Sequence, residues 1–514
     1  MDDEVGVIAG GAFGEIVLRK DSDKDLELGQ LLVYEKGDKK LILKVVDLVH
    51  GSTLPQSSVD MAQGYAREEG MPPLSVYESD EKVSYFTKAI MKPLVEIRRE
   101  GTAQTVITPK SLPEWWEAVR IARTEDLDFL QEEGAFLGYL RNGSRVINIE
   151  VRIPPEKLIA HHVLIAASTG KGKSNLVKVM LSSLAQEGCC GAFVIDPHGE
   201  YWGFHEEGLK GLGERVVLLS PEPPPGGITL RIHVDSLLPE HFSGITNLSP
   251  AQEEALQMLW KQKHGKGWLS TFLGSDVLAD MNNQGVRAST LEVLRRKLRL
   301  ILSWEDDQGI FTISGGEKTV NQIVDFLEDR KTVIVDTSSL AEGAELLISN
   351  VVASEVLRRH ERAKARGTLD RLPPVGIVLE EAARVLGEGV EPNVLERIAR
   401  EGRKFKVGLI AVTQLPSLIQ KELIANMNTK IILGNEARTE RDALINSSPQ
   451  DLSNEDEEIA QLDVGEGIVA SSFLKMAVPI KVPLFEGIRK SENKDRPKLA
   501  LSARPEKRAL YKLE

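Results

Sequence analysis

The run Val163-Leu164-Ile165-Ala166-Ala167-Ser168-Thr169-Gly170-Lys171-Gly172-Lys173-Ser174 decides the fold class of this chain. It begins as an apolar segment of strand length and continues through a glycine-rich turn. It then enters a helical pattern over Lys173–Glu187, which Gly188 ends. A strand, a glycine-rich loop and a helix in this order are typical of a phosphate-binding loop. The sequence therefore predicts an α/β domain that binds a phosphorylated ligand.

The residue types of this loop suit the polyphosphate of a nucleotide. Glycines let successive backbone N–H groups turn toward the β-phosphate, and the helix N-terminus adds positive potential. Lys173 supplies a mobile positive charge to the β- and γ-phosphates, and Ser174 offers a hydroxyl to Mg²⁺. We expect ATP and Mg²⁺ as cofactors, held by Ser168, Thr169, Gly170, Lys171, Gly172, Lys173, Ser174 and Asn175. Ala167 replaces the first glycine of the motif and requires a negative φ there.

Outward from the loop, apolar runs alternate with helical patterns, as in a parallel sheet covered by helices. The predicted strands are Val163–Ala167, Ala192–Ile195, Val216–Leu219, Val333–Val335, Ile377–Leu379, Leu409–Val412 and Ile431–Leu433. Such continuous apolar runs suit strands that are buried on both faces. Between 236 and 330 the alternation stops. There the helical patterns Ala251–Lys261, Gly267–Ala279, Thr290–Trp304 and Thr319–Asp329 predict a helical bundle inserted into the α/β domain.

A site that hydrolyses a nucleotide also needs carboxylates at the end of a neighbouring strand. Glu380 and Glu381 follow one buried strand directly, and Asp336 ends another. Two adjacent acids can divide the work, with Glu380 holding the water shell of Mg²⁺ and Glu381 polarising the attacking water. We therefore predict this pair, with Asp336 as the alternative. Asp196, which opens Asp196-Pro197-His198-Gly199-Glu200-Tyr201, also ends a strand; a simple turn and a functional acid both remain open.

Two further residues are candidates for contacts with the γ-phosphate. Gln414 emerges from the end of a buried strand, where an amide could sense the phosphate. Arg403 follows a helix that Gly402 ends, shortly before the same strand, so it faces away from the chain's own phosphates. It could instead serve the nucleotide of a neighbour as an arginine finger. Arg400 is the next candidate for that role.

The segments around the α/β domain define the predicted organisation. Short strands and glycine turns up to about residue 110 predict a small β-barrel, and Ser111–Glu132 predicts a helix that links it onward. The predicted units are the barrel with its linking helix (1–150), the first part of the core (151–235), the inserted bundle (236–330), the second part (331–480) and an extended C-terminal arm (481–514).

Composition places the chain in a class and excludes others. Hydrophobic residues make up 41% and charged residues 27%, as in a globular protein. No apolar run approaches the roughly 20 residues that cross a membrane, so we expect a cytoplasmic protein with no membrane partner. The net charge of −13 argues against a surface that coats nucleic acid, but not against a ring with a basic channel. Cys189 and Cys190 have no metal-ligand spacing.

With these residues assembled, the chain resembles the HerA branch of the HerA/FtsK superfamily. The matching pieces are Ser168–Ser174, Asp196–Tyr201, the double-acid strand end, Glu401-Gly402-Arg403-Lys404 with Thr413-Gln414, and Asn428-Thr429-Lys430. The resemblance implies a RecA-like P-loop ATPase core behind an N-terminal barrel, and a homohexameric ring that translocates on double-stranded DNA. It also implies a partner nuclease, NurA, and a role in resecting DNA ends for recombinational repair. Three positions depart from the family: Ala167, Glu380 in place of Asp, and Ala383-Arg384 in place of a His.

Two other functions stay open at this stage. A conjugation or secretion ATPase of the VirB4 type shares the motor motifs, and a nucleotide-gated ring could act as a scaffold. The basic run Arg295-Arg296-Lys297-Leu298-Arg299 suits DNA binding, but its helical context favours a solvated face of a bundle helix.

Overall fold

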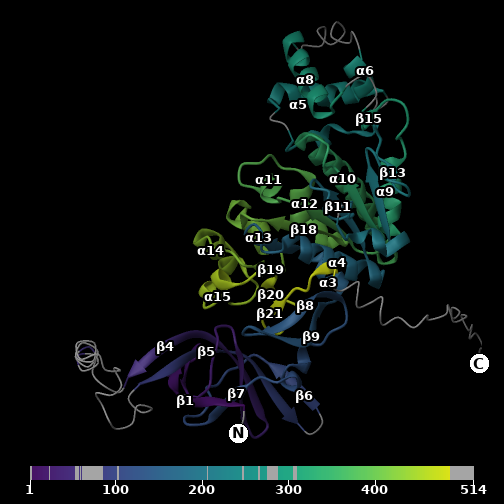
Figure 1. The fold of residues 1–514 in the computed structure, drawn as a ribbon. Coiled ribbons are helices and arrows are strands. Elements are labelled where there is room, and N and C mark those ends of the chain that lie inside the picture. The colour runs from purple at the N-terminus through teal and green to yellow at the C-terminus, as the bar shows by residue number, and fades with distance from the viewer. Residues whose placement is uncertain are drawn as a thin grey trace, which may run out of the picture.

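One twelve-stranded sheet runs through the larger part of the molecule (Figure 1). The computed structural model describes residues 3–21, 23–52, 85–100, 103–204, 206–245, 248–263, 267–274, 287–304 and 309–486, together with Ser57 and Asp60. In order across the sheet, the strands are β13 (Ile228–Thr229), β12 (Val216–Ser220), β16 (Thr332–Asp336), β11 (Gly191–Asp196), β17 (Val375–Leu379), β18 (Val407–Thr413), β10 (Val163–Ala166), β19 (Thr429–Leu433), β20 (Glu466–Ser471), β21 (Val478–Lys481), β8 (Ala135–Asn142) and β9 (Arg145–Ile153).

All seven strands predicted for the α/β domain are present, and they lie side by side in parallel from β12 to β19. They are buried along their length, as the continuous apolar runs indicated. Beyond β19 the sheet continues antiparallel. The hairpin of β8 and β9 therefore belongs to this sheet. The prediction had placed it with the N-terminal unit, because the partner strand β21 lies more than 300 residues away and leaves no local signal.

Helices cover both faces of the sheet. One face carries α3 (Pro155–Ala160) and α4 (Lys173–Glu187), and the other carries α9 (Thr319–Glu328), α10 (Glu342–Ala365), α11 (Ala383–Leu386), α12 (Val394–Glu401), α13 (Lys421–Asn426), α14 (Arg438–Ser447) and α15 (Asp456–Gln461). Alternate residues of β10 enter the two cores: Leu164 joins one and Ile165 the other. No helix in the described ranges is long and apolar enough to cross a membrane.

The region predicted as an inserted bundle contains helices, but its extent differs from the prediction. α5 (Pro250–Gln262), α6 (Trp268–Gly274) and α8 (Ala288–Ile301) pack together at one end of the molecule, and the pair β14 (Ile232–His233) and β15 (Phe311–Thr312) lies beneath them (Figure 1). α9, which the prediction included, packs on β11 and β16 instead. A self-contained bundle therefore stays a prediction, and part of Gly267–Ala279 lies outside the described residues.

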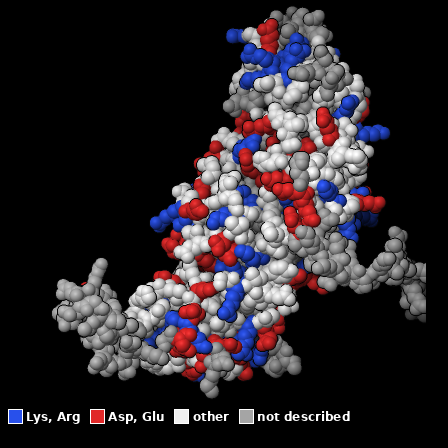
Figure 2. Space-filling view, in the orientation of Figure 1, with Lys and Arg blue, Asp and Glu red and all other residues white. Residues whose placement is uncertain are grey.

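The basic run of α8 supports the helix ends around it. Figure 2 shows Lys and Arg side chains gathered at the end of the molecule that carries this helix. Within the run, Arg295 Nε donates to the Phe272 carbonyl at 2.7 Å, and Arg299 Nη2 donates to the Leu273 carbonyl at 2.6 Å. Both carbonyls belong to the last turn of α6, where cations are favourable. This agrees with the structural interpretation of the run.

The N-terminal segment forms a closed barrel, as predicted. Its strands are β1 (Glu4–Ala12), β2 (Glu15–Lys20), β3 (Leu31–Lys36), β4 (Lys39–Ser52), β5 (Tyr85–Glu100) and β7 (Ala118–Ile121), and β6 (Ala103–Ile107) extends it from β5. The order is β2-β1-β7-β3-β4-β5, and pairing of β2 with β5 closes the ring.

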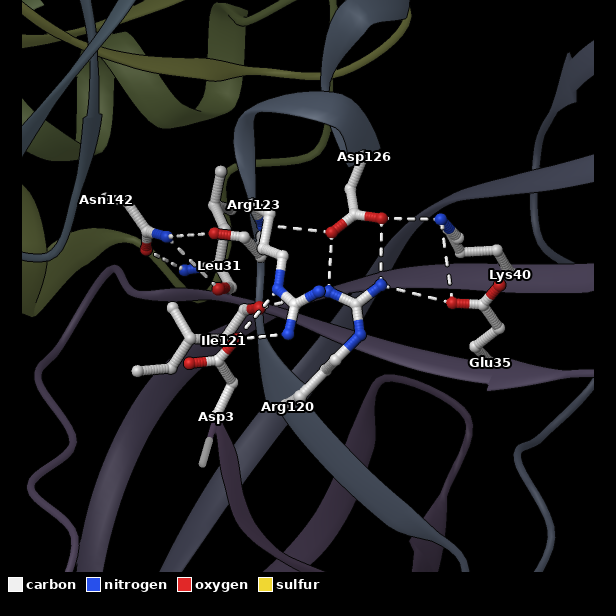
Figure 3. Close-up of polar contacts among 10 residues, drawn as sticks. Asp3, Leu31, Glu35, Lys40, Arg120, Ile121, Arg123, Asp126 and Asn142 are labelled. Atoms are coloured by element: carbon white, nitrogen blue, oxygen red, sulfur yellow. Dashed lines mark hydrogen bonds and ion pairs between the residues drawn. The ribbon is translucent and has the colours of Figure 1, made fainter. Parts of the chain in front are cut away.

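The helix predicted over Ser111–Glu132 was wrong. The middle of this segment is β7, which pairs with β1 on one side and with β3 on the other and so completes the barrel wall. The tryptophans that supported the helical pattern, Trp115 and Trp116, are 61% and 72% exposed, so they supply no core contact that would hold a helix. After the strand, Asp126 accepts bonds from Arg120 and Lys40 and from the N–H of Arg123 (Figure 3). This buried carboxylate fixes the turn through local bonds to Arg120 and Arg123 and through a long-range bond to Lys40.

Barrel and sheet are joined through buried polar groups. Asn142 of β8 accepts from the Leu31 N–H of the barrel at 2.6 Å (Figure 3). Nearby, Lys44 of β4 lies 2.5 Å from Glu458 of α15 and 3.6 Å from Glu455, and Arg141 of β8 lies 2.6 Å from Glu458. Burial raises the pKa of Glu458, but the two cations outweigh it and hold the pKa below its usual value.

We predict that Glu458→Ala destabilises the protein by about 3–5 kcal/mol, because it leaves the buried Arg141 without its carboxylate and the buried Lys44 with only the more distant Glu455. The measurement is the urea midpoint. Glu457→Ala, on the exposed face of the same helix, is the control and should shift stability by less than about 0.5 kcal/mol. Because the folded pKa of Glu458 is lowered, its contribution is present above its unfolded pKa and is lost as pH falls toward the folded one. Equal midpoints for the two variants would contradict the assignment.

Candidate nucleotide-binding site

The phosphate loop spans the ends of three parallel strands. The Ala167 N–H donates to the Thr413 carbonyl of β18 at 3.3 Å, and the Ser168 N–H donates to the Gly434 carbonyl after β19 at 3.0 Å. Gly170 and Gly172 have φ of +78° and +100°, which only glycine adopts without strain. Ala167 is not among the positions with positive φ, so the alanine at this position meets the requirement stated from the sequence.

Lys173 and Ser174 begin α4 at the end of this loop. The Lys173 ammonium donates to the carbonyls of Ala167 at 3.0 Å and Ser168 at 3.3 Å, so it lies over the loop. Burial lowers its pKa, and the carboxylates of Glu380 and Glu200 act in the opposite direction. A charge held here, at the N-terminus of a 15-residue helix, is suited to a phosphate group.

Three acids end adjacent strands beside the loop. Asp196, Asp336 and Glu380 follow or end β11, β16 and β17, which are neighbours in the sheet. Burial raises the pKa of Glu380, and the nearby Glu200 and Asp196 raise it further. Burial raises the pKa of Asp196 as well. Among the described residues, acidic groups outnumber positive groups at this edge, which suits the binding of a cation with the nucleotide.

The Asp196–Tyr201 segment shapes one wall of the site. Asp196 accepts the N–H groups of Glu200 at 3.0 Å and Tyr201 at 2.9 Å, and the fully buried Tyr201 donates its hydroxyl to Glu380. Tyr201 is thus a site residue that the sequence interpretation did not include. The motif was recognised, but its tyrosine reaches a carboxylate 179 residues away, which no local pattern reveals.

The Asp336 carboxylate is hydrogen-bonded to a serine of its own turn and to a serine of the adjacent strand β12. It accepts from Ser220 Oγ at 3.0 Å and from Ser338 Oγ at 2.7 Å. These bonds satisfy its carboxylate, and the choice of Glu380 and Glu381 over Asp336 stays a prediction.

Glu381 does not join the cluster. Its carboxylate is 2.8 Å from Arg384 Nη1 and about half exposed, and Arg384 also bonds Glu342. Its φ of +49° is uncommon for a residue other than glycine. The two adjacent acids therefore point in different directions, and only Glu380 lies among the groups around Lys173.

Gln414 lies at the loop, as predicted. Its Oε1 accepts from Thr169 Oγ1 at 2.7 Å, because β18 pairs in parallel with β10. Two loop residues have different partners from those expected. The Lys171 ammonium donates to the Leu462 carbonyl at 2.9 Å, and the Asn175 amide bonds Pro483 and Phe485, each at 2.9 Å. Their side chains hold later parts of the chain, including the start of the predicted arm; residues 487–514 of that arm lie outside the described residues.

Arg403 lies at the opposite edge of the sheet, in η8 (Gly402–Phe405), which precedes β18. It is exposed, and no ion pair holds it within the described ranges. Arg400, the alternative, bonds Glu396, Glu422 and Gln420. The structure therefore leaves Arg403, rather than Arg400, available to a group outside the chain.

The described residues fit Mg²⁺ held together with a nucleotide. They contain no group of three or more His, Cys, Asp or Glu side chains that could hold a metal alone. Mg²⁺ commonly takes one or two protein oxygens and completes its shell with phosphates and water. The Ser174 hydroxyl and the Glu380 carboxylate suit that arrangement. Taken together, the loop, helix and acids define a P-loop nucleotide-binding α/β protein.

Within the class of P-loop proteins, this chain is similar in sequence to a family of helicases. Residues 135–356 match the family model described as "Helicase HerA, central domain". The chain is 27% identical to the DNA double-strand break repair helicase HerA of Sulfurisphaera tokodaii, over 90% of each chain, and 25% identical to that of Saccharolobus solfataricus, over 91% of this chain and 89% of the relative. Among solved structures, VirB4 of Thermoanaerobacter pseudethanolicus aligns with a TM-score of 0.47 at 17% identity, covering 69% of this chain and 97% of that one. The chain is thus similar to HerA helicases along most of its length, and the matched family model covers its central part.

We predict that Lys173→Ala abolishes measurable ATP binding, because it removes the only ammonium that lies over the loop in the described structure. Lys171→Ala is the matched control. Its ammonium bonds Leu462, so affinity should fall by less than about tenfold, the equivalent of one hydrogen bond. Titration calorimetry with a slowly hydrolysed ATP analogue gives both values. If Lys171→Ala lost more affinity than Lys173→Ala, the roles of the two lysines would be reversed.

Proposed function

We propose that this chain is an ATP-driven translocase or helicase that acts on double-stranded DNA, and that it is a HerA protein in the strict sense. The observation that carries the proposal is the convergence of Lys173, Glu380 and Gln414 at one sheet edge. The relatives that share 90% of its length are named DNA double-strand break repair helicases, which supports DNA as the track. Resection of DNA ends with a NurA-type nuclease, in the cytoplasm, completes the proposal.

In this proposal each residue at the edge has one task. Lys173 and the loop N–H groups bind the β- and γ-phosphates, and Ser174 and Glu380 hold Mg²⁺. When bound, Mg²⁺ would neutralise negative charge that develops on the phosphates. Tyr201 keeps the Glu380 carboxylate oriented. Glu381 polarises the attacking water after its ion pair with Arg384 opens, and Gln414 turns from Thr169 to the γ-phosphate.

The active form is a homohexameric ring in which Arg403 serves the neighbouring subunit. Arg403 and the loop lie at opposite ends of the same strands, so one subunit cannot supply both to one nucleotide. Its planar guanidinium suits charge that spreads over equatorial phosphate oxygens in the transition state.

Duplex DNA tests motor against scaffold. A motor should hydrolyse ATP several-fold faster with linear duplex DNA, and should displace a bound block from the duplex only while ATP is hydrolysed. A ring that serves only as a scaffold would show DNA-independent turnover and no displacement, and that result would contradict the proposal. Electron microscopy with and without DNA tests the ring.

Glu381 and Asp336 should differ in their effects on turnover. We predict that Glu381→Gln binds ATP but slows hydrolysis by about 10²-fold or more, as expected for loss of a residue that activates water. Asp336→Asn should keep most of the activity, because its amide oxygen can still accept from Ser338 and its amide nitrogen can donate to the Ser220 hydroxyl oxygen. The measurement is single-turnover hydrolysis. If Asp336 proved essential and Glu381 dispensable, Asp336 and not Glu381 would be the acid required for hydrolysis.

Mixing of variants tests the shared site. Arg403→Ala subunits keep an intact loop, and Lys173→Ala subunits keep an intact Arg403. Each pure ring should be inactive, and mixed rings should regain ATPase at interfaces that pair the two intact halves. Full activity of pure Arg403→Ala rings, or no recovery despite demonstrated subunit exchange, would contradict the arrangement.

A further inference from the structure

Three residues outside the proposed chemistry meet at the edge opposite the phosphate loop. β18, β10 and β19 are adjacent and parallel, so the residues that precede them share one sheet edge. These residues are Arg403 before β18, His161 after α3, and Asn428 before β19. Asn428 opens the Asn428-Thr429-Lys430 motif, whose role the proposed function leaves unassigned.

Asn428 fixes the orientation of the His161 ring. Its backbone N–H donates to the His161 carbonyl at 3.1 Å, and its Nδ2 lies 3.0 Å from His161 Nδ1. An amide nitrogen can only donate, so Nδ1 is the acceptor and the neutral ring carries its proton on Nε2. The edge of Phe473 supports the ring, with centroids 4.8 Å apart and an interplanar angle of 84°. Within the described part of the chain, Nε2 has no hydrogen-bond partner.

The surroundings of His161 favour this neutral donor and attract anions. Burial lowers the pKa of His161, and the positive charges of Arg403 and Lys157 lower it further. Lys157 lies over Phe473, 5.7 Å from its centroid. Within the described structure, the charged groups that act on this ring are both cations. The edge therefore offers a guanidinium and a neutral N–H side by side, which suits an anion with several oxygens.

The rest of the motif holds Asn428 in place. Thr429 Oγ1 bonds Ser471 Oγ at 2.9 Å, and the buried Lys430 ammonium donates to the Met427 carbonyl at 2.9 Å. Both contacts fix the backbone on either side of the position from which Asn428 projects. A loop fixed in this way positions a hydrogen-bond donor more accurately than a free loop would.

We propose that His161, positioned by Asn428, donates its Nε2–H to a phosphate oxygen of the nucleotide held by a neighbouring copy of this chain, beside Arg403. This inference rests on the proposed ring. β10 separates His161 from the chain's own loop by four residues, or about 13 Å at 3.3 Å per residue, so the donor cannot reach its own nucleotide. At the chain's own site, the arginine nearest the acids, Arg384, is bonded to Glu381 and Glu342.

Substitutions of His161 test the donor. His161→Phe keeps the ring packing against Phe473 and should lower kcat by about 100-fold, the low end of the loss for one donor to a developing charge, with KM nearly unchanged. His161→Gln places an amide N–H at similar reach and should restore most of that loss. Lys157→Met removes a charge from the same edge but leaves the imidazole N–H of His161 in place, and should stay within about twofold. A loss for Lys157→Met equal to that for His161→Phe would show general electrostatics and overturn the proposal.

Asn428 is a positioning residue, which a double-mutant cycle tests. Asn428→Ala should lower kcat, and adding it to His161→Phe should cause no further loss, because the amide acts only through the imidazole. Additive losses would overturn the positioning role.

Mixed rings separate this inference from the proposed function. His161→Phe subunits keep an intact loop, and Lys173→Ala subunits keep an intact His161, so mixing should raise ATPase above the sum of the separate populations. Misfolded His161→Phe subunits could not give this gain. If Arg403→Ala complements Lys173→Ala and His161→Phe does not, only the His161 assignment fails. If neither complements despite subunit exchange, the shared site itself fails.

Discussion

The position of β10 between β18 and β19 is the constraint on which the site depends. Parallel pairing on both sides aligns the three strand ends, so the loop after β10 meets Thr413 on one flank and Gly434 on the other. The same alignment sends the residues that precede these strands to the far edge. One chain thus carries the phosphate loop on one edge and, on the other, the exposed Arg403 guanidinium, which has no ion pair among the described residues. A nucleotide that needs both requires two chains.

Electrostatics at the phosphate edge favour a loaded site. Asp196 and Glu380 are buried near each other, and burial raises the pKa of each carboxyl. The Lys173 ammonium interacts with the Glu380 carboxylate, and burial lowers the pKa of Lys173. Both effects mean that the charged forms are poorly solvated without a partner. A divalent cation and a polyphosphate would supply those partners, so binding and ionisation stabilise each other.

The sequence predicted what depends on local patterns. Apolar runs gave all seven strands of the α/β domain, and the loop, the Glu380 strand end and Gln414 lie together as expected. Two of the failures involve long-range contacts, and the third involves a local ion pair. The Ser111–Glu132 helix is a strand because β1 and β3 need a neighbour, and Tyr201 was missed because its partner is remote in sequence. Glu381 points away from the cluster because its carboxylate is paired with Arg384, three residues later.

The barrel and the phosphate loop are held by the same short segment of chain. Leu462, which accepts the Lys171 ammonium, immediately follows α15, and Glu458 of that helix bonds Lys44 of the barrel. Moving the barrel away from this helix would separate buried charges, at a cost of several kcal/mol for each unpaired ion. Moving the loop away would break the bond to Leu462. The short helix between these anchors therefore cannot shift at one end without straining the other, so the barrel and the phosphate loop are mechanically connected within one subunit.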